Sequence, residues 1–278
     1  MQMTPIEQGL ARVLGGRIAH DDEIGVRYSL SADGRRTMLD LPFAPFLTEA
    51  GADHIGIGPL ATVLDSACGI GAMVALGFRE STATVDLRID YLRDLSPGAS
   101  CQVEAGAVDV GGQPEAGMVM MRAEARDKGT NAIIAHATGQ FIRRRLPEGD
   151  LSAEAPPPAA TTNAPDYRSL MGFVSEPAGL RMPFRPGLVG NGSLPSLHGG
   201  AIAAHMQQAA CEALDTGSGR RARLTTAHFS FLRFAGGADT VASSVVERVG
   251  ASVASVRVTS SQPPDRVVAR GVFTFFRT

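Results

Sequence analysis

The chain has 278 residues, which suits two domains of ordinary size, each with its own hydrophobic core. With 26 Lys and Arg against 28 Asp and Glu, the net charge is −2, which disfavours binding to nucleic acid or to an anionic membrane. Three cysteines without a Cys-x-x-Cys pair argue against a disulfide framework or structural zinc and indicate a reducing compartment.

The N-terminal stretch 1–16 is predicted to form a short amphipathic helix. Glu7 and Arg12 interrupt what would be the apolar core of a signal peptide, so we expect a cytoplasmic protein. Residues 55–78 are apolar and long enough to span a bilayer, but Asp65 lies in mid-run and five glycines interrupt it. We therefore predict a buried central helix. Its Gly-x-Gly-x-x-Ala start lacks the preceding strand that a dinucleotide-binding loop needs.

Three short motifs recur in the same order in the two halves of the chain, which indicates an internal repeat. The motif pairs are LPFAPFL (41–47) with MPFRPGL (182–188), TVDLRIDYLR (84–93) with LTTAHFSFLR (224–233), and ATGQF (137–141) with ARGVF (269–273). The stretch between the halves is rich in Pro and Ala, as in a stiff linker. We predict an N-terminal domain at 1–146, a linker at 147–165 and a C-terminal domain at 166–278.

Each repeat has the same order of predicted elements: a short strand around Pro-Phe-x-Pro, one long apolar helix, and then alternating segments. The helices are predicted at 58–78 and 199–214. The alternating segments are 82–93, 99–110, 117–127 and 131–144, and then 222–233, 239–248, 252–261 and 266–277. Strands in hairpin succession imply an antiparallel sheet, which would wrap a helix that is apolar all round. The predicted fold class is α+β, with one helix and about five strands in each repeat.

The helix with Asp65, the strand 84–93 and the closing segment IIAHATGQF resemble the hotdog superfamily, and within it the PaaI-type acyl-CoA thioesterases. The resemblance covers residues 40–145 and 180–278 and implies a tandem double hotdog with an active site between its halves. In that family a His-Gly-Gly at a helix start offers a backbone N–H to the thioester carbonyl. An Asp nine residues after the equivalent His, on the partner's helix, activates water.

Each repeat keeps the half of this motif that the other has lost. In the second repeat His198 and Gly199 match the His-Gly, but Gln207 stands at the Asp position. In the first repeat Asp65 is present, but Gly56 replaces the His. The resemblance therefore implies one complete site, where Asp65 meets His198 and Gly199, and one inactive mirror site. Activation of water by Asp65 and direct attack by Asp65 to form an anhydride are both open.

Five further residues are weaker candidates. Thr84 aligns with a hydroxyl that helps to hold the water in relatives, and Asn191 lies one residue away from an Asn that packs by the His. The basic run Arg143, Arg144 and Arg145 is either a binding site for the phosphates of coenzyme A or a solvated strand end.

Three functions are compatible with these residues. We favour an acyl-CoA thioesterase, which needs no metal and no cofactor. The alternatives are a non-catalytic acyl-CoA-binding double hotdog, and a hydratase or dehydratase in which His198 and Asp65 move a proton and a hydroxyl. A lone Asp on an apolar helix can also be purely structural, as a backbone cap or an ion-pair partner. By the resemblance we expect a homodimer that looks like a tetramer of hotdogs.

Overall fold

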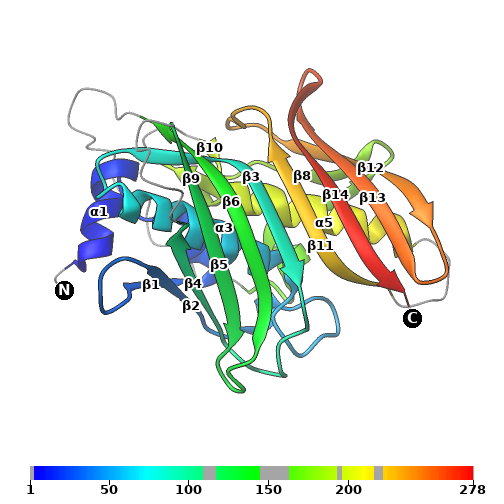
Figure 1. Cartoon of the computed structure of the whole chain (residues 1–278). Coiled ribbons are helices and arrows are strands. Elements are labelled where there is room, and N and C mark those ends of the chain that lie inside the picture. Colours follow the sequence, from blue (N-terminus) through cyan, green and yellow to red (C-terminus); the bar gives the residue numbers. More distant parts are fainter. Residues whose placement is uncertain (1–2, 109–116, 145–162, 193–195, 216–221, 278) are drawn as a thin grey trace.

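The computed structural model describes residues 3–108, 117–144, 163–192, 196–215 and 222–277. Within these residues a 12-stranded antiparallel sheet curves around two long helices (Figure 1). Its strand order is β1-β2-β4-β5-β6-β3-β11-β14-β13-β12-β8-β7. The first six strands of this order come from the N-terminal half and the last six from the C-terminal half. The α+β double-hotdog fold is therefore confirmed, with six strands of this sheet in each half where the sequence indicated about five, and with β9 and β10 in a separate two-stranded sheet.

The N-terminal half begins with two short helices and places its long helix between β2 and β3. Its elements are α1 (Pro5–Leu14), α2 (Ala19–Ile24), β1 (Arg27–Leu30), β2 (Thr37–Leu41), η1 (Pro45–Leu47), α3 (Ile57–Ala75), β3 (Ser81–Tyr91), β4 (Cys101–Ala107), β5 (Met118–Asp127) and β6 (Ile133–Arg144). The predicted N-terminal helix is present as α1, where Thr4 and Glu7 form a capping box.

The C-terminal half repeats the same plan after the segment that joins the halves. Its elements are α4 (Tyr167–Met171), β7 (Val174–Glu176), β8 (Gly179–Met182), η3 (Pro186–Leu188), β9 (Val189–Asn191), β10 (Ser196–Leu197), α5 (Gly199–Asp215), β11 (Ala222–Phe231), β12 (Thr240–Val249), β13 (Val253–Gln262) and β14 (Arg266–Arg277). Most of the predicted linker, residues 147–162, lies outside the described residues.

The Pro-Phe-x-Pro motifs are not strands. In both halves the strand ends at or before the motif, and the second proline opens a 3-10 turn, η1 at Pro45 and η3 at Pro186. Proline has no N–H to give to a sheet ladder but fits the first turn of a helix, which explains the difference.

The two halves join side by side through β3 and β11, whose register pairs Leu87 with Phe229. Side chains strengthen this junction, because His228 Nε2 lies 2.8 Å from an oxygen of Asp86 and Thr226 donates to Asp90. Since β3 and β11 follow α3 and α5 in the chain, pairing them brings the two helices together inside the sheet (Figure 1).

The starts of the two helices approach closely. A Cβ on Gly200 of α5 would lie 2.6 Å from the Cα of Thr62 on α3, so this contact requires glycine. Among the described helices, α3 alone is long and apolar enough to cross a membrane by length and composition, and 78% of its apolar stretch is buried inside the protein. It is the predicted buried central helix. The contact between α3 and α5 places the first half of α3, from Thr62 to Asp65, against the first turn of α5.

Candidate active site

Asp65 is a buried carboxylate in the middle of α3, with 4% of its surface exposed. The Thr84 hydroxyl, from β3, donates to Asp65 Oδ1 at 2.9 Å, and the backbone N–H of Gly200 also donates to the carboxylate. These two bonds favour the charged form, but burial disfavours it more strongly and raises the pKa of Asp65 to about 6. Asp65 is therefore a stronger base than a solvated carboxylate and is still ionised at neutral pH.

The first turn of α5 lies directly against this carboxylate. A Cβ on Gly199 would lie 2.8 Å from Asp65 Oδ2 and 3.2 Å from Thr84 Oγ1, so only glycine permits this approach. The N–H groups of a first helical turn have no intrahelical carbonyl partner, and they carry the positive end of the helix dipole. A negative oxygen beside Gly199 would therefore be stabilised.

His198 precedes this turn, and its ring is buried beside Asp65. Its Nε2 lies 3.6 Å from Asp65 Oδ2 and 3.1 Å from the hydroxyl of Ser66. Burial lowers the pKa of His198 to about 3, and the neighbouring His20 acts in the same direction. The ring is consequently neutral at physiological pH. The ring can orient groups by hydrogen bonding, but it carries no positive charge to offset the negative charge of Asp65.

A cavity of about 400 Å³ opens beside these groups. Its polar lining includes Asp65, Thr84, His198 and Gly199. Its apolar lining includes Leu14, Ile18, Ile70, Met73 and Phe231. A polar reacting end together with an apolar wall suits a substrate that has one polar functional group on a hydrocarbon chain.

The remaining predicted site residues are distributed unequally around this cavity. Asn191 and Arg144 line it, and the Arg144 guanidinium lies 5.9 Å from the centre of the Phe234 ring. Arg143 is not among the lining residues, because its guanidinium forms two hydrogen bonds with the carboxylate of Glu80. That Arg143 contacts a phosphate stays a prediction. Arg145 lies outside the described residues.

The mirror position holds a neutral amide. Gln207 on α5 accepts a hydrogen bond from the Tyr91 hydroxyl at 2.6 Å and donates to the carbonyl of Ile57 at 3.1 Å. Ile57 opens α3 where Gly199 opens α5, and the helix is preceded by Gly56 in place of a histidine. An amide that is already bonded on both sides cannot accept a proton from water.

Three residues of this arrangement were missed by the sequence analysis: Ser66, Gly200 and Asp21. Ser66 and Gly200 adjoin predicted residues, so their proximity could have been foreseen. Asp21 lies in the acidic stretch His-Asp-Asp-Glu, which has the composition of an exposed helix, yet its side chain is fully buried. Nothing in the local sequence distinguishes Asp21 from Asp22.

Two family models match the chain, one in each half. The thioesterase superfamily matches residues 58–133, and the acyl-CoA thioesterase N-terminal domain matches residues 191–276. The first match contains Asp65 and Thr84, and the second contains His198 and Gly199. Comparison with curated proteins gives no significant match.

Solved structures share the fold at low sequence identity. The tesB protein of Mycobacterium avium subs paratuberculosis is 15% identical with a TM-score of 0.63, and the alignment covers 95% of this chain and 99% of that one. A putative thioesterase II from Thermobifida fusca is 13% identical with a TM-score of 0.58 over 100% of both chains. An acyl-ACP thioesterase from Bacteroides thetaiotaomicron is 12% identical with a TM-score of 0.57, over 88% of this chain and 100% of its own.

The two family matches fall on successive repeats and together cover more than half of the chain, and the whole-chain structural matches share the double-hotdog architecture. The chain therefore belongs to the thioesterase superfamily, as a thioester hydrolase built from two hotdog repeats in tandem.

Proposed function

We propose that the chain hydrolyses the thioester of an acyl-CoA at one composite site between its two repeats. Asp65 of the first repeat acts as the base, and the backbone N–H of Gly199 in the second repeat stabilises the oxyanion. The proposal rests on the close contact between the buried Asp65 carboxylate and the start of α5. A Cβ atom at position 199 would lie 2.8 Å from Asp65 Oδ2, so only glycine permits this contact.

The chemistry follows from this contact. The thioester carbonyl oxygen accepts a hydrogen bond from Gly199 N–H, while Asp65 takes a proton from a water molecule whose oxygen adds to the carbonyl carbon. The tetrahedral intermediate carries a negative oxygen, which each aligned donor stabilises by about 3–4 kcal/mol. When the intermediate collapses, the carbon–sulfur bond breaks, and the proton held by Asp65 goes to the leaving thiolate of coenzyme A.

Hydrolysis through water requires less rearrangement than direct attack by the carboxylate. Asp65 Oδ1 is bonded to Thr84, and Oδ2 is enclosed by Gly199 and His198. An oxygen held in this way can accept a hydrogen bond from water, whereas anhydride formation needs that oxygen itself to reach the thioester carbon. We therefore assign Asp65 the role of general base.

The apolar wall of the cavity supports an acyl group as the second half of the substrate. Leu14 and Ile18, from the N-terminal segment, line it together with Met73 at the end of α3. Of the two predicted arginines that the structure describes, Arg144 lines the cavity, so we propose that it contacts a phosphate of coenzyme A.

The test is a panel of acyl-CoA thioesters of increasing chain length with a thiol reagent that reports free coenzyme A. Release of coenzyme A that disappears in Asp65→Asn supports the proposal. Binding of acyl-CoA without release would favour a binding protein, and hydration of a crotonyl thioester would favour a hydratase. Thioesters of acyl carrier protein, tested in parallel, show whether the chain acts on acyl groups carried by coenzyme A or by acyl carrier protein.

We also propose that two chains associate through their outer sheet faces. Val272 and Phe276 of β14 are exposed, and the partner of Phe276 on β13 is Val253, which is exposed as well. Val245 on β12 lies opposite Arg257 of β13, which pairs with Val272, and extends this apolar surface, which burial against a second copy would remove from water. Sedimentation equilibrium should give the mass of two chains, whereas a single-chain mass at all concentrations would refute the dimer.

A further inference from the structure

Asp21 is a second buried acid beside the thioester site, contributed by the short N-terminal helix α2. Its side chain has 0% exposure, and both carboxylate oxygens are hydrogen-bonded. The Ser66 hydroxyl donates to Oδ1 at 2.7 Å, and the Tyr28 hydroxyl donates to Oδ2 at 2.9 Å. Among the described residues no Arg or Lys forms an ion pair with Asp21. A buried carboxylate without a counter-charge is costly to keep, so its presence needs a reason beyond packing.

Ser66 connects Asp21 to His198. A serine hydroxyl has one proton, and here it is given to Asp21, so toward His198 the Ser66 oxygen can only accept. The Nε2 atom of His198, 3.1 Å away, must therefore carry the hydrogen. The neutral ring then has its N–H at Nε2 and its lone pair at Nδ1, for which no hydrogen-bond partner is found among the described residues.

This tautomer matters because Nε2 also lies 3.6 Å from Asp65 Oδ2. With the hydrogen on Nε2, bonded to Ser66, the positive end of the N–H dipole lies near the carboxylate. With the hydrogen on Nδ1, two lone pairs would face each other across the same gap, and Asp65 would lose its support on that side. The charged Asp21 carboxylate selects between these two tautomers of His198, because it accepts the Ser66 hydroxyl hydrogen. If Asp21 is protonated or absent, the Ser66 hydroxyl can donate to His198 Nε2 instead.

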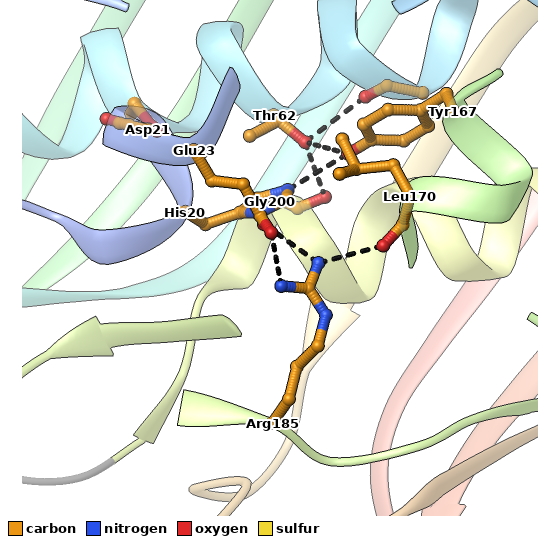
Figure 2. A network of polar contacts seen from close by, with 10 residues as sticks. His20, Asp21, Glu23, Thr62, Tyr167, Leu170, Arg185 and Gly200 are labelled. Atoms are coloured by element: carbon orange, nitrogen blue, oxygen red, sulfur yellow. Dashed lines mark hydrogen bonds and ion pairs between the residues drawn. The ribbon is translucent and has the colours of Figure 1, made fainter. Parts of the chain in front are cut away.

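The other buried polar residue of α2 serves as an anchor for the helix. His20 Nε2 lies 3.0 Å from the Tyr167 hydroxyl, which lies 3.1 Å from the Thr62 hydroxyl (Figure 2). Thr62 donates in turn to the carbonyl of Gly200 at 3.3 Å. Helix α2 lies outside both segments that match the family models, so neither match includes Asp21. The Tyr167 contacts hold α2 in place, whereas the Asp21 contacts lead to the site.

We propose that Asp21 is a positioning residue for thioester hydrolysis, which acts through Ser66 to keep the ring hydrogen of His198 on Nε2, the nitrogen that faces Asp65. The inference rests on the proposed function, because it presumes that Asp65 is the base. It makes helix α2 part of the active site.

The relay gives the reaction a pH dependence with a definite sign. Burial, with smaller contributions from the charges of Asp22 on α2 and Asp65 on α3, raises the pKa of Asp21 to about 7. The hydroxyls of Ser66 on α3 and Tyr28 on β1 lower it, and the buried His198 ring is neutral. As the pH falls, Asp21 therefore gains its proton near pH 7, before Asp65 gains its own near pH 6. Protonation of either one should lower activity.

The experiment measures kcat and kcat/KM from pH 5 to 9 for the full-length wild type, Asp21→Asn, Ser66→Ala and the double variant. In the wild type we expect the acid limb of log kcat/KM to be steeper than a slope of one, because both carboxylates gain protons there. Asp21→Asn should reduce the slope to one, move the limb to lower pH, and lower kcat at pH 8 with KM little changed. The loss should be about tenfold to a hundredfold, the range for partners that orient functional histidines in metal sites. The double variant should be no worse than the poorer single variant.

Two hydroxyl variants serve as controls. Tyr28→Phe removes a bond that lowers the pKa of Asp21, so the upper step should move to higher pH, opposite to the effect of Asp21→Asn. Tyr167→Phe weakens the other anchor of α2 and should keep the wild-type slope and midpoint. An unchanged slope and kcat in Asp21→Asn would overturn the inference, and so would the same loss in Tyr167→Phe.

A measurement without substrate separates this inference from the proposed function. In protein labelled with ¹⁵N-histidine, the His198 ring should show the hydrogen on Nε2 at pH 8 and lose this preference in Ser66→Ala. If Asp65→Asn is inactive but His198 keeps its tautomer in Ser66→Ala, only the relay is wrong. If Asp65→Asn keeps full activity, the proposed function fails whatever the tautomer.

Discussion

Asp65 Oδ2 and His198 Nε2 come from different repeats and lie 3.6 Å apart, with both side chains buried. This contact exists once in the described part of the chain, because Gln207 and Gly56 occupy the corresponding positions of the mirror arrangement. In a homodimer of identical single hotdogs the two sites would be equivalent. A covalent link between the repeats removes that constraint, and under the proposed function each repeat retains only the residues that one site needs.

Replacing Asp65 with Asn should lower kcat/KM by several orders of magnitude, since an amide keeps the shape but cannot accept a proton. The matched change is Gln207→Asn on the mirror side, which should leave turnover close to that of the wild type. Steady-state rates on the best acyl-CoA decide the matter. A comparable collapse in Gln207→Asn would mean that the working site is on the other side.

Thr84 should act mainly through the charge of Asp65. Its hydroxyl bond lowers the pKa of Asp65, so Thr84→Val should raise that pKa above the value of about 6 and move the acid limb of kcat/KM to higher pH. Thr84→Ser keeps the donor and should restore the wild-type midpoint. If Val and Ser at this position gave the same pH profile, the hydroxyl would have no part in setting the base.

Gly199→Ala tests the close approach of α5 to the carboxylate. Alanine has the higher helix propensity, so the substitution should favour the helix by itself. Its Cβ would nevertheless lie 2.8 Å from Asp65 Oδ2, which forces the carboxylate or the helix start to move. We expect a loss of at least a hundredfold in kcat, on the scale of removing one oxyanion donor. A folded variant with normal kcat would exclude Gly199 from the site.

Stability should depend on pH through the same carboxylate. The folded-state pKa of Asp65 is raised from 3.8 to about 6, so the native protein binds the extra proton between these values and loses stability as the pH rises through them. The loss amounts to about 3 kcal/mol when the shift is converted at 1.36 kcal/mol per unit. Asp65→Asn has no charge to bury, so relative to the wild type it should gain about this much between pH 4 and pH 8. Urea unfolding at the two pH values measures the difference, and a difference that stays constant would argue against a buried charge.

The sequence predicted most of the fold because the regular elements carry strong local patterns. The long helix predicted at 58–78 is found at Ile57–Ala75, and the strand predicted at 266–277 is found at Arg266–Arg277. Alternation of buried and exposed side chains fixes such strands whatever surrounds them. The Pro-Phe-x-Pro segments were misassigned because strand and 3-10 turn meet within a few residues there.

The candidate site was predictable only in part. The internal repeat and the family resemblance together pointed to Asp65, His198 and Gly199, which the structure brings together. Asp21 could not be foreseen, since its burial depends on how α2 packs on α3. The ion pair of Arg143 with Glu80 could not be foreseen either, because a basic run in the sequence does not reveal which of its members an acidic side chain engages.

The central claim is that one chain carries one working site, and the binding stoichiometry of a substrate analogue tests it most directly. Isothermal titration with a non-hydrolysable acyl-CoA analogue, on protein of known concentration and mass, should give one analogue bound per chain. Gly199→Ala should strongly weaken the binding of that one analogue. The position that corresponds to Gly199 in the first repeat is Ile57, which already has a side chain. Two analogues bound per chain with similar affinity would contradict the account, because the mirror position would then be a functional site as well.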